Sequence, residues 1–143
     1  ALLRICNMAR ECLFADTNIF LRFLTRDDVE KAEACRTLLE RAERGEVDLA
    51  ISHLILAELA WTLKSYYHLP KQEIVGNLRD ILNLRSIRAP QRALLLRAVH
   101  LYEQFNIDFV DAYNAAEMEK RGVRRICSYD EDFDKLGIER VTP

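Results

Sequence analysis

The chain has few of the residues that break regular structure, with only four Gly and three Pro among 143 residues. No segment is of low complexity, and we find neither a linker nor an internal repeat. No apolar run approaches the length of a transmembrane helix, so no membrane partner is expected. The opening segment ALLRICN is short and interrupted by Arg4, which argues against a signal peptide. We therefore expect one cytoplasmic domain over residues 11–143, preceded by an extension over residues 1–10.

Cysteine and histidine are sparse and lack the spacing of a metal site. None of the four cysteines forms a C-x-x-C pair, and the three histidines are scattered. Because Cys12 and Cys127 fall in expected buried strands, we interpret the cysteines as reduced core residues. A disulfide framework or a zinc site is not expected.

Glycine-rich phosphate loops are also missing. The sequence contains no G-x-G-x-x-G and no G-x-x-x-x-G-K-[ST], which argues against a nucleotide-binding fold. The formal net charge is −2, so no global basic field indicates nucleic acid. Sixteen Arg against five Lys still allow local basic patches, because the planar guanidinium suits phosphate.

Short apolar runs that predict strands alternate with helical patterns of about 10–15 residues. This order predicts a three-layer α/β/α fold, in which helices cover both faces of a mainly parallel sheet of four to five strands. Ligands of such sheets bind at the carboxyl ends of the strands. The expected strands cover about 12–16, 48–52, 86–89, 124–129 and, at an edge, 139–142. The expected helices cover 19–24, 27–45, 54–67, 71–84, 91–105 and 107–122, with a short helical turn at 130–136.

The first expected strand ends on a carboxylate. Asp16 follows the apolar run CLFA, and the polar residues Thr17 and Asn18 come directly after it. Asp16 could be the N-cap of the next helix, since Asp is among the best N-cap residues. Thr17 or Asn18 could also serve as that cap, so Asp16 remains a candidate functional acid.

A second acid lies in a helix that is apolar on every side. Glu58 is the only charged residue between His53 and Lys64, and the pattern predicts that this helix is buried. A buried carboxylate is costly unless it is paired, protonated or bound to a cation. A salt bridge to an Arg elsewhere is the ordinary alternative.

Two further acids share one side of a later helix. Asp108 and Asp111 lie one turn apart, and Ala112 and Ala115 complete an acidic face of small residues. Both acids could simply favour the positive end of the helix dipole. That explanation suits Asp108 better than Asp111, which is deeper in the helix.

The fourth expected strand, RRICSY, is also followed by an acid, Asp130. Ser128 and Glu131 have the spacing of a capping box, so a purely structural cap is a serious alternative. Asp132 and Asp134 have the positions of acids that favour a helix N-terminus.

One hypothesis accounts for all four candidate acids, which are Asp16, Glu58, Asp111 and Asp130. Two follow strands and two lie on helices that can pack beside the strand ends, so the four could converge. Clustered carboxylates without His or Cys favour hard cations, here Mg²⁺ or Mn²⁺. Such a cation lowers the pKa of a bound water and neutralises phosphate charge, which suits phosphodiester hydrolysis. Thr17, Asn18 and Ser128 could then hold the carboxylates or waters.

From Leu13 to Val141 the chain resembles PIN domains. The segments that carry the resemblance are DTN, AELAWTL, VDAYNAA and SYDEDFD, which place the family's four acids at Asp16, Glu58, Asp111 and Asp130. Ser128 replaces the more usual Thr, and Asp108 is an additional acid without an assigned role. The stretch over residues 58–82 is similar to VapC-like toxins of toxin–antitoxin pairs. The resemblance implies a metal-dependent endoribonuclease acting on RNA, often a homodimer, that a small antitoxin protein inhibits.

Apolar positions on the helix pair 54–67 and 71–84, among them Tyr66, Tyr67 and Leu69, are expected to contribute to a dimer or to hold an antitoxin. The main alternative function is a PIN fold that binds RNA or protein without cleaving it. A phosphatase of the haloacid dehalogenase type would need an acid where Asn18 stands. A receiver domain would need an Asp at the end of a central strand, where DLAISH has none.

Overall fold

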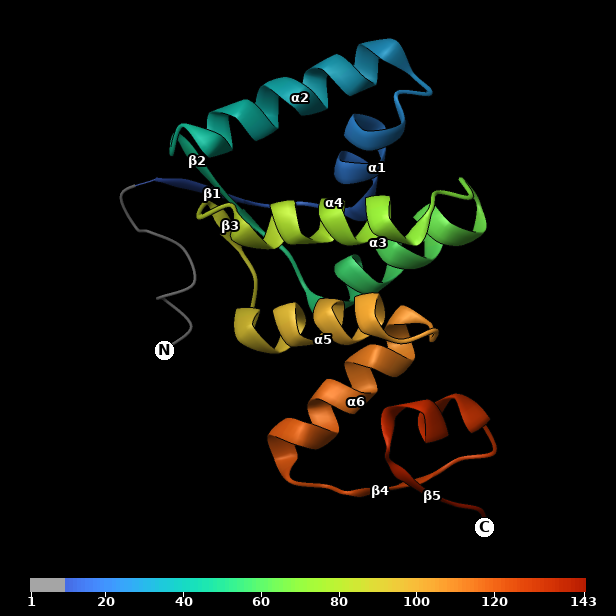
Figure 1. The fold of residues 1–143 in the computed structure, drawn as a ribbon. Coiled ribbons are helices and arrows are strands. Elements are labelled where there is room, and N and C mark those ends of the chain that lie inside the picture. Colours follow the sequence, from blue (N-terminus) through green and yellow to red (C-terminus); the bar gives the residue numbers. More distant parts are fainter. Residues whose placement is uncertain (1–9) are drawn as a thin grey trace. The chain divides into compact units, whose positions relative to one another are not determined.

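A computed structural model describes residues 10–143, which divide into two compact units with a boundary between Pro90 and Gln91. The expected N-terminal extension lies outside the described residues, apart from Arg10. Every strand pair in both units is parallel, and strands alternate with helices along the chain (Figure 1). The predicted α/β fold class with five strands is therefore confirmed. The strands form one sheet of three and one sheet of two.

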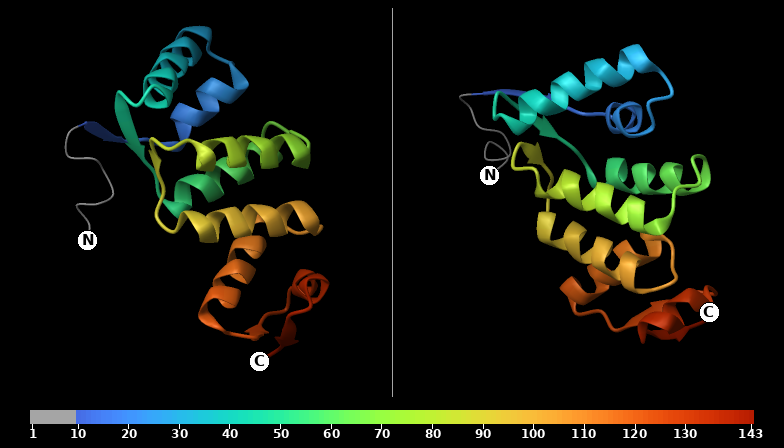
Figure 2. Two further views of the ribbon diagram at one scale, coloured as in Figure 1. Left: turned by 60° about the vertical axis from the view of Figure 1, so that its left-hand side comes forward. Right: turned by 45° about the horizontal axis from the view of Figure 1, so that its top comes forward.

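The first unit is a three-stranded parallel sheet in the order β1-β2-β3, with two helices in each crossover. Leu49 in the central strand lies opposite Leu13 in β1 and Ile87 in β3, and both Leu49 and Ile87 are fully buried. Helices α3 and α4 run side by side in both views of Figure 2. The elements are β1 (Glu11–Phe14), α1 (Thr17–Thr25), α2 (Val29–Glu43), β2 (Val47–Ala50), α3 (His53–Ser65), α4 (Lys71–Asn83) and β3 (Ile87–Arg88).

The second unit is built on a helix pair, followed by a small parallel sheet. Tyr102 of α5 and Phe109 of α6 meet edge to face, with ring centroids 5.9 Å apart. Cys127 of β4 lies opposite Val141 of β5, and a short 3₁₀ helix connects these strands. The elements are α5 (Arg92–Gln104), α6 (Phe109–Arg121), β4 (Arg125–Cys127), the 3₁₀ helix η2 (Glu131–Leu136) and β5 (Glu139–Val141).

The prediction that the first strand is buried is wrong. All four residues of β1 are exposed, including Phe14 at 69%. Among the described residues β1 pairs only with β2, so it is an edge strand of its sheet. Cys12 is disulfide-bonded, which corrects the expectation that every cysteine is reduced. Cys127 is exposed rather than buried, whereas Cys35 is a buried free thiol.

The prediction that α3 is buried on every side is wrong for one of its faces. Leu56, Leu59 and Leu63 are fully buried, as expected. Leu54 and Trp61, however, are 79% and 64% exposed, and Glu58 between them is exposed too. Residues at such spacing share one side of a helix, so α3 presents an apolar stripe with a carboxylate at its middle. Within residues 10–143 no helix is both long and apolar enough to cross a membrane.

Candidate functional site

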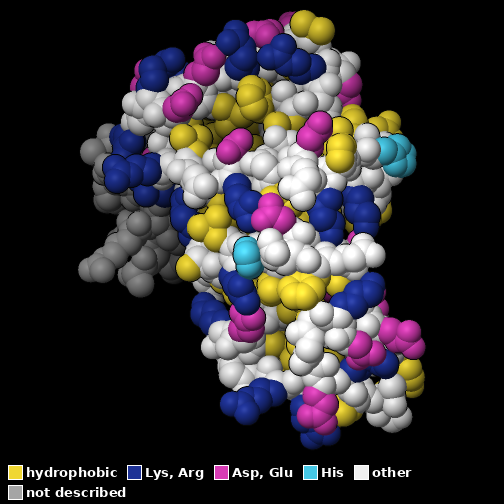
Figure 3. Space-filling view, in the orientation of Figure 1, with side chains coloured by type: hydrophobic (Ala, Val, Ile, Leu, Met, Phe, Trp, Pro, Cys, Tyr) yellow, Lys and Arg dark blue, Asp and Glu magenta, His cyan; other side chains and the backbone are white. Residues whose placement is uncertain are grey.

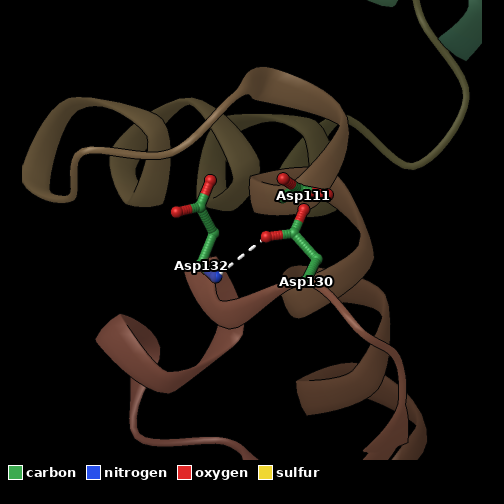
Figure 4. A group of neighbouring side chains, drawn as sticks. All are labelled: Asp111, Asp130 and Asp132. Atoms are coloured by element: carbon green, nitrogen blue, oxygen red, sulfur yellow. Dashed lines mark hydrogen bonds between the residues drawn. The ribbon is translucent and has the colours of Figure 1, made fainter.

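The second unit brings three carboxylates together. Asp111 lies in the first turn of α6, while Asp130 and Asp132 come from the loop after β4 and the start of η2. One carboxylate oxygen from each residue lies within 4.8 Å of the others (Figure 4). We call these three residues the aspartate cluster. Two of them, Asp111 and Asp130, are acids that the sequence predicted for the site.

Local hydrogen bonds fix the loop that carries two of these acids. Asp130 is the N-cap of η2, and its Oδ1 accepts a hydrogen bond of 2.9 Å from the backbone N–H of Asp132. The backbone N–H of Asp130 in turn donates to Ser128 Oγ, also at 2.9 Å. The capping residue is therefore Asp130, whereas the predicted capping box gave that role to Ser128. Ser128 instead fixes the backbone at Asp130.

The environment of Asp111 disfavours its charged form. Partial burial raises the pKa of Asp111, and repulsion from Asp130, Asp108 and Asp132 raises this pKa further. Asp108 is the exposed N-cap residue of α6, so it acts on Asp111 from the preceding turn. Lys135 Nζ lies 2.6 Å from Asp132 Oδ1 and provides a positive charge beside the cluster. Negative charge therefore surrounds Asp111, while Lys135 offsets part of it at Asp132.

The other two predicted acids lie in the first unit, joined by a buried threonine. Asp16 is the N-cap of α1, and its Oδ1 accepts a 2.8 Å hydrogen bond from the Thr17 N–H. The Thr17 hydroxyl donates a 2.9 Å hydrogen bond to Glu58 Oε2. Thr17 is only 2% exposed, so it connects the end of β1 to α3 beneath the surface.

The structure corrects the prediction for Glu58. Glu58 was expected to be buried, with a salt bridge to an Arg as the ordinary alternative to a cation site. Its carboxylate is exposed instead, and no Arg within residues 10–143 forms a salt bridge with it. Asn18 is exposed in the first turn of α1, beside the N-cap. Asp16 is the N-cap of α1, as one explanation of this residue proposed, but the capping hydrogen bond uses only its Oδ1.

Sequence reasoning missed two acids. Asp132 was assigned only to the helix dipole, because spacing along the chain does not show that the turn after Asp130 brings it back towards Asp111. Asp48 was overlooked although it is the one polar residue of the strand over residues 47–50, and it is completely buried. Its Oδ2 accepts a 3.2 Å hydrogen bond from Arg88 Nη2 in β3, and Arg10 Nη1 lies 3.8 Å from its Oδ1. Asp48 thus has a structural role in the sheet.

The donor atoms of the aspartate cluster suit a particular class of ion. All are carboxylate oxygens, which are the usual ligands of Mg²⁺ and Mn²⁺. Like charges held this closely repel one another, and a bound cation would offset that repulsion. The residues present therefore fit a hard divalent cation.

The chain is similar to one protein family and to known proteins. The PIN domain family model matches residues 13–139. The VapC ribonuclease of Aquifex aeolicus (strain VF5) is 25% identical over 128 residues, which cover 90% of this chain and 94% of that protein. The solved structure of VapC20 from Mycobacterium tuberculosis, described as a sarcin–ricin loop cleaving toxin, is 21% identical. Its match covers 92% of this chain and 99% of that one, with a TM-score of 0.39.

Proposed function

The chain belongs to the PIN-domain family, and on that premise we propose that it is a metal-dependent endoribonuclease that hydrolyses phosphodiester bonds in RNA. The aspartate cluster is the observation that carries the proposal, because its three carboxylates supply hard oxygen donors within 4.8 Å. The similarity to a VapC ribonuclease along 90% of the chain supports RNA as the substrate. By the same similarity we propose that the protein is the toxin of a toxin–antitoxin pair.

We assign Mg²⁺ or Mn²⁺ to the aspartate cluster, with oxygens of Asp111, Asp130 and Asp132 as the ligands. When bound, the cation supplies charge neutralisation for the phosphate and an acidified water. The chain's own contribution is to hold these oxygens in place. Ser128 fixes the backbone of Asp130, and Asp130 fixes the first turn of η2 in which Asp132 lies.

In the first unit, Thr17 has the corresponding positioning role. Its buried hydroxyl donates to Glu58, which limits the orientations of that carboxylate. Its backbone N–H holds one oxygen of Asp16. We propose that hydrolysis requires Asp16 and Glu58 as well as Asp111 and Asp130.

The exposed apolar stripe of α3 supports the proposal of protein partners. Leu54 and Trp61 on this helix, and Tyr66 just after it, are 79%, 64% and 71% exposed. Of the other residues expected there, Tyr67 and Leu69 are half-buried. Large exposed apolar side chains close together are typical of protein interfaces. We propose that a second copy of the chain covers this stripe, and that a small antitoxin protein inhibits the enzyme.

RNA cleavage by single-residue variants tests the proposal. Wild-type protein with Mn²⁺ should cleave single-stranded RNA, leaving 5′-phosphate ends, and EDTA should abolish cleavage. Asp16→Asn, Glu58→Gln, Asp111→Asn and Asp130→Asn should each lower the rate by about a hundredfold. Asp134→Asn is the matched control, because Asp134 lies in η2 but is paired with Arg140 outside the cluster. Full activity in EDTA would contradict metal dependence. Full activity of all four variants would leave a PIN fold whose predicted acids are not catalytic.

A further inference from the structure

The cations of the second unit that have no acidic partner are concentrated at one place. Lys120, Arg121 and Arg124 are exposed, and none of them forms an ion pair within residues 10–143. By contrast, Arg97, Lys135 and Arg140 of the same unit are paired with Glu119, Asp132 and Asp134. Figure 3 shows dark-blue side chains at the end of this unit where α6 leads into β4. We call Lys120, Arg121, Arg124 and Arg125 the basic turn.

The helix dipole explains only part of this charge. Lys120 and Arg121 lie in the last turn of α6, where cations are favoured. Arg124, however, lies beyond the helix. Gly122 adopts the left-handed conformation at φ 68°, and the Val123 N–H bonds back to the carbonyl of Met118. This bend ends α6 and puts Arg124 in the connection to β4, where no helix dipole favours it. Arg125 is paired with Glu139 at 3.3 Å, but both side chains are about two-thirds exposed.

A surface hollow lies beside the basic turn. It has a volume of about 520 Å³ and lies between α6 and β4. Arg121 and Arg125 line it, and so do Asn114 and Cys127. Asn114 is one turn after Asp111 on α6, and Ser128 and Asp130 follow Cys127 on the other wall. The lining of the hollow thus runs along α6 from Arg121 back to Tyr113, which is two residues after Asp111 in the sequence. Asp111 and Arg121 are ten residues apart in the helix, which corresponds to about 15 Å.

We infer that the basic turn and the hollow beside it bind the sugar–phosphate backbone of RNA, about four stacked nucleotides from the aspartate cluster at about 3.4 Å each. This inference rests on the proposed ribonuclease function, and it assigns a substrate-binding surface to that function. An acidic protein segment would also be attracted to the basic turn. Glu117 in the wall of the hollow repels an acidic segment and RNA alike. The proposed function selects RNA, because the strand that is cleaved must extend past the aspartate cluster.

Salt-dependent RNA binding in EDTA tests the inference without any cleavage. The probe is a fluorescent single-stranded oligouridylate, and the variant is Arg121→Gln with Arg124→Gln. Affinity falls as salt rises, and each phosphate contact contributes about 0.7 to the magnitude of the slope of log affinity against log salt concentration. The double variant should therefore reduce that magnitude by about 1.4. Replacing both residues by Lys should restore it. The control is Arg26→Gln with Arg85→Gln, which removes two exposed arginines of the first unit that form no ion pair among the described residues. This control should leave the slope within about 0.3 of the wild type.

Two results would overturn the inference. One is an equal fall in slope for both double variants, because RNA would then respond to net charge alone. The other is an unchanged slope with lost binding of poly-L-glutamate, which would assign the basic turn to an acidic protein. Cleavage with Mn²⁺ is measured separately. If the wild type cleaves RNA but the double variant of Arg121 and Arg124 has an unchanged slope, only this inference is wrong. If the double variant has a smaller slope but the wild type does not cleave RNA, only the ribonuclease proposal is wrong.

Discussion

Asp111 is a carboxylate whose ionisation opposes folding in the absence of a cation. Partial burial and three neighbouring acids raise its pKa, so the folded chain holds this proton more tightly than the unfolded chain does. Stability is therefore lost as the pH rises from the ordinary aspartate pKa, about 4, through the raised pKa of the folded state. The repulsion is a property of Asp111 in the cluster, and it disappears when this residue is replaced by Asn.

We predict that, in EDTA, the melting temperature of Asp111→Asn increases relative to that of the wild type as the pH rises through this range, because only the wild type ionises at this position. Below about pH 4 both side chains are uncharged and the difference should be small. Melting curves recorded across the pH range measure it. The control is Glu30→Gln, which removes an exposed acid from the first turn of α2 and should only lose a dipole interaction. A difference for Asp111→Asn that is independent of pH would contradict the assigned repulsion.

Thr17 is the residue that holds Glu58, and its hydroxyl can be removed without changing its volume much. We predict that Thr17→Val lowers the rate of RNA cleavage by about 10–100-fold, because the Glu58 carboxylate loses its 2.9 Å donor. Thr17→Ser keeps the hydroxyl and should retain most of the activity. Comparison of the two variants by single-turnover kinetics is the measurement. Equal losses would mean that packing at this buried site matters and the hydrogen bond does not.

Among the helices, α3 shows what an apolar sequence does and does not determine. The run LILAELAWTL predicted a helix correctly, because it lacks Gly and Pro and its length exceeds that of a typical strand. It did not predict that Leu54 and Trp61 are exposed, since an apolar side chain on a helix can contact the protein's own core or another molecule. Both possibilities produce the same sequence pattern, but only contact with the protein's own core stabilises the isolated chain.

We predict that Trp61→Gln changes the free energy of unfolding of the isolated chain by less than about 0.5 kcal/mol. Leu59→Ala on the buried side of the same helix should cost about 2–5 kcal/mol. Urea unfolding of both variants measures this contrast. In sedimentation equilibrium, Trp61→Gln should also weaken self-association if a second copy covers the stripe. A large loss of monomer stability in Trp61→Gln would place this side chain in the core instead.

The loop from β4 to η2 shows the limit of sequence reasoning about the site. The position after a strand singled out Asp130, and the acidic face of a helix singled out Asp111, before the PIN resemblance included both in the predicted site. Asp132 could not be found in this way, because its place in the cluster depends on the turn that the Asp130 cap forms. The exposure of Glu58 was also beyond the sequence, since burial depends on which side of α3 faces the core. The order of helices and strands along the chain was predictable, whereas the surroundings of each side chain required the tertiary structure.

For the whole molecule, the parallel pairing of all five strands follows from the alternation of strands and helices along the chain. The division into a unit ending at Pro90 and a unit starting at Gln91 did not follow from the sequence, because no change in composition marks it. Each unit contains two of the four acids that the sequence predicted. The proposed function requires that a divalent cation binds the folded protein through the aspartate cluster.

The most direct test of this claim is the melting temperature at neutral pH as a function of Mn²⁺ concentration, for the wild type and Asp111→Asn. A ligand that binds only the folded state stabilises it by about 2.7 kcal/mol at a hundred times its Kd, and the effect grows with the logarithm of concentration. We predict this rise for the wild type and for the control Asp134→Asn, and little or no rise for Asp111→Asn. A wild-type melting temperature that is indifferent to Mn²⁺, or an equal rise in Asp111→Asn, would contradict it.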